Sequence, residues 1–320
     1  LIEARLRGLD ATGCDVNPVS RLVCEVVSRP LPASELVIEN RRFMDALTER
    51  LTPESSLFFR PEKRVKRGFQ FAYCAEYFDP DTTADIGSYL DLVEHSPAQF
   101  RDLHLMNLLA VLRRISRANI KKMNVEIDDS KLTKVSLLDA IRKQVGTVER
   151  LNSEYVDWAR DCTVTVLDRD AQDTQLPDAS FDTVFLHPPY LTNTAFSEFS
   201  QLQLALLGID HKTIWRRELR CRGSFVHEPD GLRKYLIGWC KVMAEAVRVL
   251  RPGGLIITVV GDGQIDYVRI PVGAITLEYA KDLGLSCLEH FLHVLNNNTG
   301  RTQSRKMIGQ HVAVLRKPDV

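Results

Sequence analysis

The apolar positions of the chain fall into short runs typical of strands and longer periodic stretches typical of helices. Short runs bounded by turn residues favour strands, and we expect those at 163–167 and 183–186 to be buried. Strands that alternate with helices predict an α/β fold with a largely parallel sheet. The strand-like runs are 11–14, 163–167, 183–186 and 255–260, and helical periods begin at Pro18 and cover 196–207, 232–250 and 270–283.

Two further patterns complete the predicted architecture. From about Ser34 to Trp158 helical periods dominate, and 100–115 is almost wholly apolar. Near the end, 285–295 and 312–315 predict an antiparallel pair that closes the sheet. We therefore expect three segments. Residues 1–30 begin an α/β core, 31–159 form a mostly helical insertion, and 160–320 complete the core.

Charge does not assign a partner to the chain as a whole. The 320 residues hold 42 Lys and Arg against 42 Asp and Glu, so the formal net charge is +0. A polyanion would therefore have to meet a local basic surface. Basic residues cluster at 60–67, 113–122, 216–222 and 301–306.

Cysteine usage and hydropathy bear on the compartment. The seven cysteines are scattered and contain no Cys-x-x-Cys pair, which favours a reducing compartment and argues against structural zinc. His290 and His293 lie in a strand-like run, and we expect no metal there. No apolar run approaches the ~20 residues of a membrane span, and no secretory leader is recognisable. We expect a cytoplasmic protein.

The most informative residues are His187-Pro188-Pro189-Tyr190, which follow the apolar run 183–186. Proline cannot continue a sheet ladder, so the pair ends the strand. The carboxyl ends of strands are where α/β sheets bind ligands. The pattern predicts a rigid loop that places a polar and an aromatic side chain at that edge.

This four-residue motif resembles motif IV of the amino-methyltransferases, in which Asp, Asn or Ser usually stands first. The resemblance implies that His187 and the Pro188 carbonyl accept hydrogen bonds from a target amino group. Pro189 would stiffen the loop and Tyr190 would stack on a base flipped out of double-stranded DNA. A neutral imidazole offers one acceptor nitrogen and a protonated one offers none. The alternative is a degenerate, inactive site.

The same resemblance implies S-adenosylmethionine as the cofactor. Residues 1–4, Gly8 and 13–18 are similar to the stretch that runs from just after motif I through motif II, which places Glu3, Asp15 and Asn17 among the cofactor-binding residues. Asp15 would accept hydrogen bonds from the ribose hydroxyls, and its alternative role is that of a helix cap. Asp170 would bind the cofactor's adenine amino group, with Asp168 as runner-up and turn capping as the alternative reading of the pair.

The expected activity is methyl transfer to an exocyclic amino group of DNA. Residues 190–193 and 202–208 resemble cytosine-N4 enzymes, so cytosine N4 is slightly preferred over adenine N6. The alternatives are an RNA or tRNA base amino-methyltransferase and a catalytically silent DNA-binding subunit of a modification or defence complex. The glycine-rich motif I is missing. It is absent through truncation, supplied by a second polypeptide, or lost in a remnant that no longer binds the cofactor. By position, 31–159 would recognise the target and the loop 296–306 would contact DNA.

Overall fold

The computed structural model describes residues 1–52, 76–122, 125–128, 135–191, 195–219, 228–294 and 309–319. These residues form two compact units, and each unit takes two pieces of the chain. Unit 1 consists of Leu1–Asp168 and Ser197–Ile214, and unit 2 of Arg169–Phe196 and Trp215–Val320.

Unit 1 contains a short parallel sheet. Strand β1 (Ala11–Cys14) pairs with β2 (Val164–Leu167), and Cys14 lies opposite Leu167 at their carboxyl ends. Helix α1 (Ile2–Leu6) precedes β1, and α2 (Pro18–Ser28) follows it. The Asn17 side chain caps α2 by accepting a 3.0 Å hydrogen bond from the Val19 amide. Proline in the first turn suits a helix start because its missing N–H would have no helical partner.

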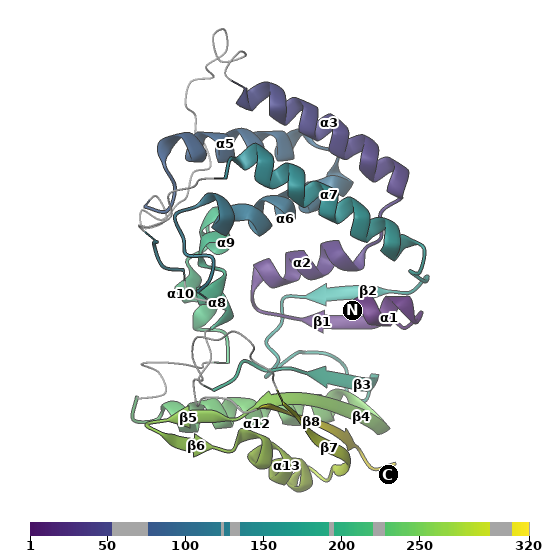
Figure 1. The fold of residues 1–320 in the computed structure, drawn as a ribbon. Coiled ribbons are helices and arrows are strands. Elements are labelled where there is room, and N and C mark those ends of the chain that lie inside the picture. Colours follow the sequence, from purple (N-terminus) through teal and green to yellow (C-terminus); the bar gives the residue numbers. More distant parts are fainter. Residues whose placement is uncertain are drawn as a thin grey trace. The chain divides into compact units, whose positions relative to one another are not determined.

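Residues 31–159 are mostly helical where the structure describes them, as the sequence pattern predicted. Figure 1 shows α3 and α7 side by side, with α5 and α6 next to them. Helix α6 is the most buried, because Leu103, Leu108 and Leu112 are almost fully enclosed. The four helices are α3 (Ala33–Leu51), α5 (Pro80–His95), α6 (Ala98–Ile115) and α7 (Leu137–Val156).

The single helix predicted for 196–207 is wrong. The segment forms α8 (Phe196–Phe199) and α9 (Gln201–Leu206), and α10 (His211–Trp215) follows. Ser200 separates the first two because its backbone is not helical. Its hydroxyl instead accepts a 3.0 Å hydrogen bond from the Asn17 side-chain amide.

Unit 2 is built on a four-stranded sheet of order β3-β4-β8-β7 (Figure 1). The strands are β3 (Phe181–Leu186), β4 (Leu250–Gly261), β7 (Ser286–Val294) and β8 (Gly309–Arg316). Strands β3 and β4 are parallel, and β8 and β7 add antiparallel pairings. The α/β class and the antiparallel closing pair are thus confirmed.

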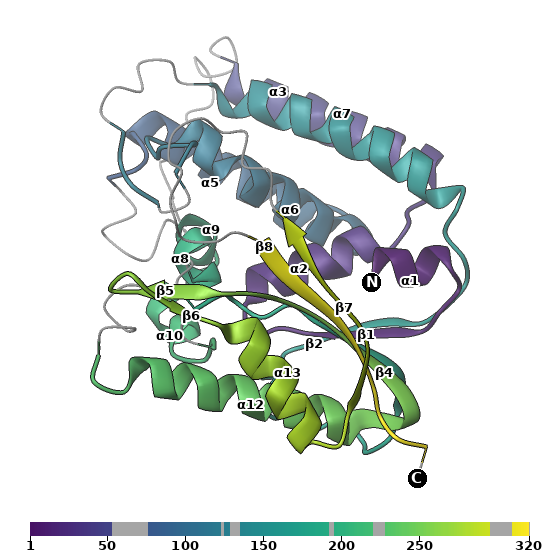
Figure 2. The same cartoon turned by 60° about the horizontal axis from the view of Figure 1, so that its bottom comes forward.

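Two helices cover one face of this sheet, α12 (Gly231–Val249) and α13 (Val272–Asp282), and Figure 2 shows both on the same side of β4. Trp239 of α12 donates a 2.8 Å hydrogen bond from its indole to the Thr276 hydroxyl of α13. The apolar core between helices and sheet includes Trp239, Met243, Ile256, Val260, Ala313 and Leu315.

The expectation that 163–167 and 183–186 are buried strands is wrong for both. No residue of β2 or β3 is fully buried. In β3, Val184 lies opposite Ile256 and packs on the core, whereas Phe185 points to the other face and is 64% exposed. The reason is that β3 is an end strand of its sheet and alternate side chains of a strand face opposite sides.

A hairpin that the sequence pattern did not indicate follows β4. Strands β5 (Gly263–Ile265) and β6 (Val268–Ile270) pair with Gly263 opposite Ile270. The helix predicted from Ile270 therefore begins later, at Val272, because Ile270 belongs to β6 and Pro271 caps α13.

Candidate functional site

The loop after β3 holds His187 and Tyr190 against each other. His187 Nε2 lies 2.8 Å from Tyr190 Oη, and the two rings meet edge to face with centroids 5.5 Å apart. Partial burial lowers the pKa of His187 below its ordinary value, which favours the neutral imidazole at pH 7. If Nε2–H donates to the phenol oxygen, the lone pair of Nδ1 remains available as an acceptor.

The same loop is held by helix α12. Tyr235 of α12 donates a 2.9 Å hydrogen bond from its hydroxyl to the Pro189 carbonyl. Leu191 is fully buried in a cluster with Tyr235 and Val272. Because the Pro189 carbonyl is engaged, the backbone acceptor expected of this loop remains the Pro188 carbonyl.

Tyr190 is only 7% exposed. Burial raises the pKa of its phenol, and a hydrogen bond with the Gln310 side chain opposes the rise. A base can therefore reach the face of the Tyr190 ring only after its surroundings move. The stacking role assigned to Tyr190 stays a prediction.

Asp262, which directly follows β4, collects several donors that sequence reasoning missed. Its carboxylate accepts a 3.0 Å bond from the Gly273 amide and a 2.6 Å bond from Arg269 Nη2, and His311 Nε2 lies 3.4 Å away. Burial alone would raise the pKa of Asp262, but the bonds from Gly273 and Arg269 outweigh it and the pKa is lowered. Asp262 is thus an ionised group that ties the hairpin and α13 to the end of β4.

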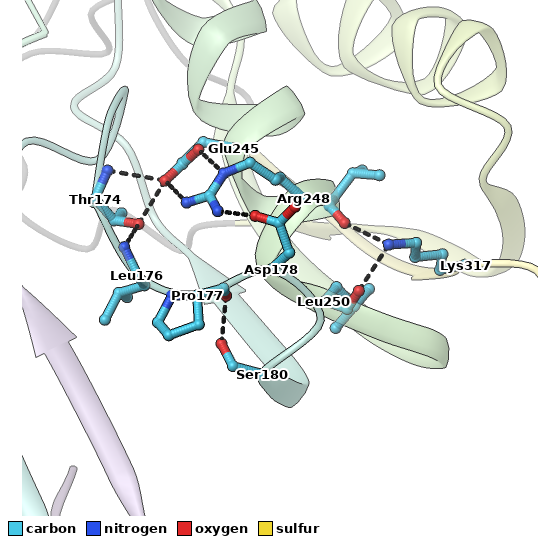
Figure 3. A network of polar contacts seen from close by, with 10 residues as sticks. Thr174, Leu176, Pro177, Asp178, Ser180, Glu245, Arg248, Leu250 and Lys317 are labelled. Carbon is cyan, nitrogen blue, oxygen red and sulfur yellow. Dashed lines mark hydrogen bonds and ion pairs between the residues drawn. The ribbon is translucent and has the colours of Figure 1, made fainter.

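A polar network fixes the segment that leads into β3 (Figure 3). Glu245 accepts from the Thr174 amide at 2.8 Å and from Arg248 Nη2 at 2.6 Å. Arg248 also pairs with Asp178. These hydrogen bonds, Arg248 foremost, lower the pKa of Glu245 to about 2. At the end of α12, Lys317 Nζ donates to the carbonyl of Leu250 at 2.7 Å.

Asp170 lies in unit 2, before β3, and caps its own turn. Its carboxylate accepts a 2.9 Å hydrogen bond from the Gln172 amide, and its carbonyl accepts a 3.0 Å bond from the Asp173 amide. The turn-capping alternative is therefore realised. The cofactor role of Asp170 remains a prediction.

In unit 1, Asp15 and Asp168 follow the paired ends of β1 and β2. Arg21 of α2 joins them, because its Nη1 donates to the Asp15 carbonyl at 2.9 Å and lies 3.1 Å from Asp168 Oδ1. Burial raises the pKa of Asp15, although bonds from the Asn17 amide and the Ser20 side chain oppose the rise. Sequence reasoning missed Arg21, which lies six residues beyond Asp15 on the first turns of α2.

The two remaining residues expected to bind the cofactor, Asn17 and Glu3, differ in burial and in their contacts. Asn17 is buried and caps α2, so the capping alternative considered for Asp15 falls on Asn17. Glu3 is exposed on α1, with Arg7 Nε 4.0 Å from its carboxylate. Their assignment to the cofactor remains a prediction.

The basic cluster 113–122 is described in part. Arg113 stacks over the Phe199 ring at 5.0 Å and donates to the Lys122 carbonyl, and Arg114, Arg117 and Lys121 are exposed. The clusters 60–67 and 301–306, the loop 296–306, and 220–222 lie outside the described residues.

The described part of the chain lacks two kinds of feature. No group of three or more His, Cys, Asp or Glu there could hold a metal ion. No helix there is long and apolar enough to cross a bilayer.

Comparison with known proteins establishes no family. No family model and no curated protein matches the chain. Among solved structures, a candidate DNA modification methylase from Thermus thermophilus shares 23% identity over 47% of this chain and 52% of its own, with a TM-score of 0.30. In complex with S-adenosyl-L-methionine, that protein gives 21% identity over 47% and 54%, with a TM-score of 0.31.

A SAM-dependent methyltransferase from Methanosarcina mazei shares 12% identity over 50% of this chain and 69% of its own, with a TM-score of 0.27. The chain spans about half the length of the Thermus protein. Scores this low carry no argument about function. Only the residues and contacts of this chain bear on its function.

Proposed function

We propose that the chain transfers a methyl group from S-adenosylmethionine to the exocyclic amino group of a flipped DNA base, with cytosine N4 slightly preferred over adenine N6. The observation that carries the proposal is the contact between His187 and Tyr190 at the end of β3. It fixes a neutral imidazole in a loop that two prolines and Tyr235 make rigid.

The target nitrogen is a poor nucleophile because its lone pair is delocalised into the base. His187 Nδ1 and the Pro188 carbonyl accept its two hydrogens and so favour a pyramidal nitrogen with an available lone pair. Both are acceptors without a charge of their own, and the lowered pKa of His187 keeps the imidazole in that form. The contribution of this loop is positioning.

The cofactor, when bound, supplies an electrophilic methyl group on a sulfonium. Asp15 fits a ribose because a carboxylate has about four acceptor sites, and the Asn17 amide and Ser20 hydroxyl satisfy only part of them. Arg21 would hold Asp15 and Asp168 at the strand ends. Asp170 would bind the adenine amino group with the acceptor sites that Gln172, whose backbone amide and side chain both donate to its carboxylate, does not occupy.

Two partners belong to the proposal. DNA phosphates would meet the exposed Arg114, Arg117 and Lys121 of the helical segment 31–159, to which we assign target recognition. The glycine-rich strand of motif I would come from another part of the same protein or from a second polypeptide. Among the described residues β3 lies at the end of its sheet, so a further parallel strand could pair with its outer edge.

The test is nucleoside mass spectrometry on unmethylated DNA and on tRNA, each incubated with the chain and isotope-labelled S-adenosylmethionine. Labelled N4-methylcytosine or N6-methyladenine, lost in His187→Ala and kept in the matched surface variant Arg251→Lys, is the expected result. Label in tRNA alone would replace DNA by RNA as the substrate. DNA binding without label would leave the silent-subunit alternative.

A further inference from the structure

The turn between β5 and β6 is strained at a tyrosine. Ile265 pairs with Val268, so Asp266 and Tyr267 alone form the turn. Their φ angles are +47° and +66°, both in the left-handed region. Two-residue hairpin turns of this kind favour Asn or Asp first and glycine second. Asp266 suits its position, whereas Tyr267 carries a bulky side chain where glycine would be free of strain.

The strain is not offset by burial of the ring. Tyr267 is 90% exposed and the neighbouring Val268 is 62% exposed. A large aromatic side chain in a strained turn, held out into solvent, contributes little to the fold. Strain of this kind collects at ligand-binding positions, so the exposed ring is a candidate contact for a ligand.

The hairpin is anchored to the loop that carries His187 and Tyr190. At Gly263, a Cβ atom would lie only 2.7 Å from the Leu191 side chain, so the β5 backbone touches the residue that follows Tyr190. Ile265 and Ile270 pack on the same cluster as Leu191 and Tyr235. The arm is therefore rigid at its base.

A second contact, made by Asp262, anchors the hairpin directly before its first strand. Arg269 of β6 donates to Asp262 from Nε at 2.9 Å and from Nη2 at 2.6 Å. At ~3.3 Å per strand residue, the arm carries Tyr267 on the order of 10 Å beyond Gly263. The turn that carries the ring thus lies a short distance along an anchored hairpin from the loop proposed to hold the target base.

We propose that Tyr267 stacks on a nucleobase of DNA beside the position from which the target base is extruded. The inference rests on the proposed function and names a further binding residue for it. The turn residues Asp266 and Tyr267 carry no cationic group that could bind a phosphate, which disfavours a contact with the DNA backbone. Stacking on the face of a base needs no cationic group, and an aromatic side chain can stack on any of the bases.

The experiment compares Tyr267→Gly, which removes both strain and ring, with Tyr267→Phe, which keeps the ring. The probe is a mixed-sequence duplex that contains one abasic site flanked by 2-aminopurine, because the missing base leaves a gap for an aromatic wedge. Affinity is read by fluorescence anisotropy, stacking by 2-aminopurine fluorescence, and folding by thermal unfolding.

We expect Tyr267→Gly to unfold at the same or a higher temperature than the wild type and to bind the probe about tenfold more weakly, since stacking contributes on this order. Tyr267→Phe should bind within about twofold of the wild type, because the ring rather than the hydroxyl stacks. Only the variants with a ring should alter the 2-aminopurine signal.

Equal binding by wild type and Tyr267→Gly would overturn the inference while leaving methylation untouched. A single-stranded RNA serves as the second probe, and a ring-dependent effect on this RNA but not on the duplex would also overturn the inference. Ring-dependent duplex binding by a chain that methylates nothing would support Tyr267 and reject the proposed enzyme. Absence of any DNA binding by the wild type would reject both.

Discussion

His187 Nε2 and the Tyr190 phenol oxygen lie 2.8 Å apart, and this contact decides which nitrogen of the imidazole can act. If the phenol donates to Nε2, Nδ1 carries the proton and the ring has no lone pair left for a substrate. If Nε2–H donates to the phenol oxygen, Nδ1 is an acceptor. The proposed chemistry requires the second tautomer.

The activity of His187 variants should follow acceptor capacity. His187→Ala is expected to lower kcat on the order of 100-fold, whereas His187→Asn keeps a carbonyl acceptor and should retain more activity. In the wild type, activity should be constant above about pH 6.5, the ordinary pKa of His, and fall as pH drops through the lowered pKa. His187→Asn should lack this acid limb. An identical limb in both proteins would assign the titration to another group.

Arg21 should control cofactor binding through Asp15 and Asp168. Arg21→Met removes the cation that holds both strand ends and should weaken binding of S-adenosylmethionine about tenfold in calorimetric titration, while the helical circular dichroism stays unchanged. Arg21→Lys keeps the positive charge but lacks the planar guanidinium, so its affinity for S-adenosylmethionine should lie between those of the wild type and Arg21→Met. Unaltered affinity in Arg21→Met would show that these aspartates do not contact the cofactor.

Glu245 should stabilise unit 2 only above the acid range. Its folded pKa of about 2 lies below its ordinary value, so its contribution is complete above about pH 4.5 and is lost as pH falls towards 2. Glu245→Gln should cost roughly 2 kcal/mol at pH 7, because Arg248 and the Thr174 amide lose a charged acceptor. Urea unfolding at pH 7 and pH 3 measures the difference. A deficit that does not shrink at pH 3 would contradict this linkage.

His104 should make unit 1 sensitive to mild acid. The side chain is fully buried between Phe43, whose ring stacks on it at 3.9 Å, and Glu39 at 3.4 Å. Burial lowers the pKa of His104 to about 4. The unfolded chain therefore binds the proton first, and stability should fall by about 3 kcal/mol as pH drops from about 6.5 to 4.

Helical circular dichroism in urea, followed against pH, tests the role of His104. His104→Gln is less stable at pH 7 because it loses the stacked ring, yet its stability should change little between about pH 6.5 and 4. If the variant and the wild type lose the same stability in this window, a different buried group is responsible.

Strand positions could be predicted because local patterns determine them. Residues 11–14 match β1, and 163–167 match β2 to within one residue. Burial could not be predicted, because it depends on neighbours far along the chain. Phe185 looks like a core residue, but its exposure follows from the end position of β3 and from helices that cover the opposite face.

The same distinction between local pattern and long-range contact applies to the candidate site. Residue types that follow strands, such as Asp15 and His187, are visible in a sequence. Two partners are not visible there: Arg21, which contacts Asp15, depends on the phase of α2, and Gln310, which contacts Tyr190, depends on strand register in unit 2. The β5–β6 hairpin could not be predicted, because its strands have three residues each and are too short to show an alternation of apolar and polar positions.

The division of both units into two chain segments has a consequence for synthesis on the ribosome. Strand β2 pairs with β1 across some 150 residues, as Val164 lies opposite Ala11. Unit 1 cannot be complete until Ile214 has emerged, and by then the first piece of unit 2, Arg169–Phe196, is already outside. Strand β3, which leads into the His187 loop, therefore cannot pair until β4 has been synthesised. Until then β3 of the nascent chain is exposed and accessible to chaperones.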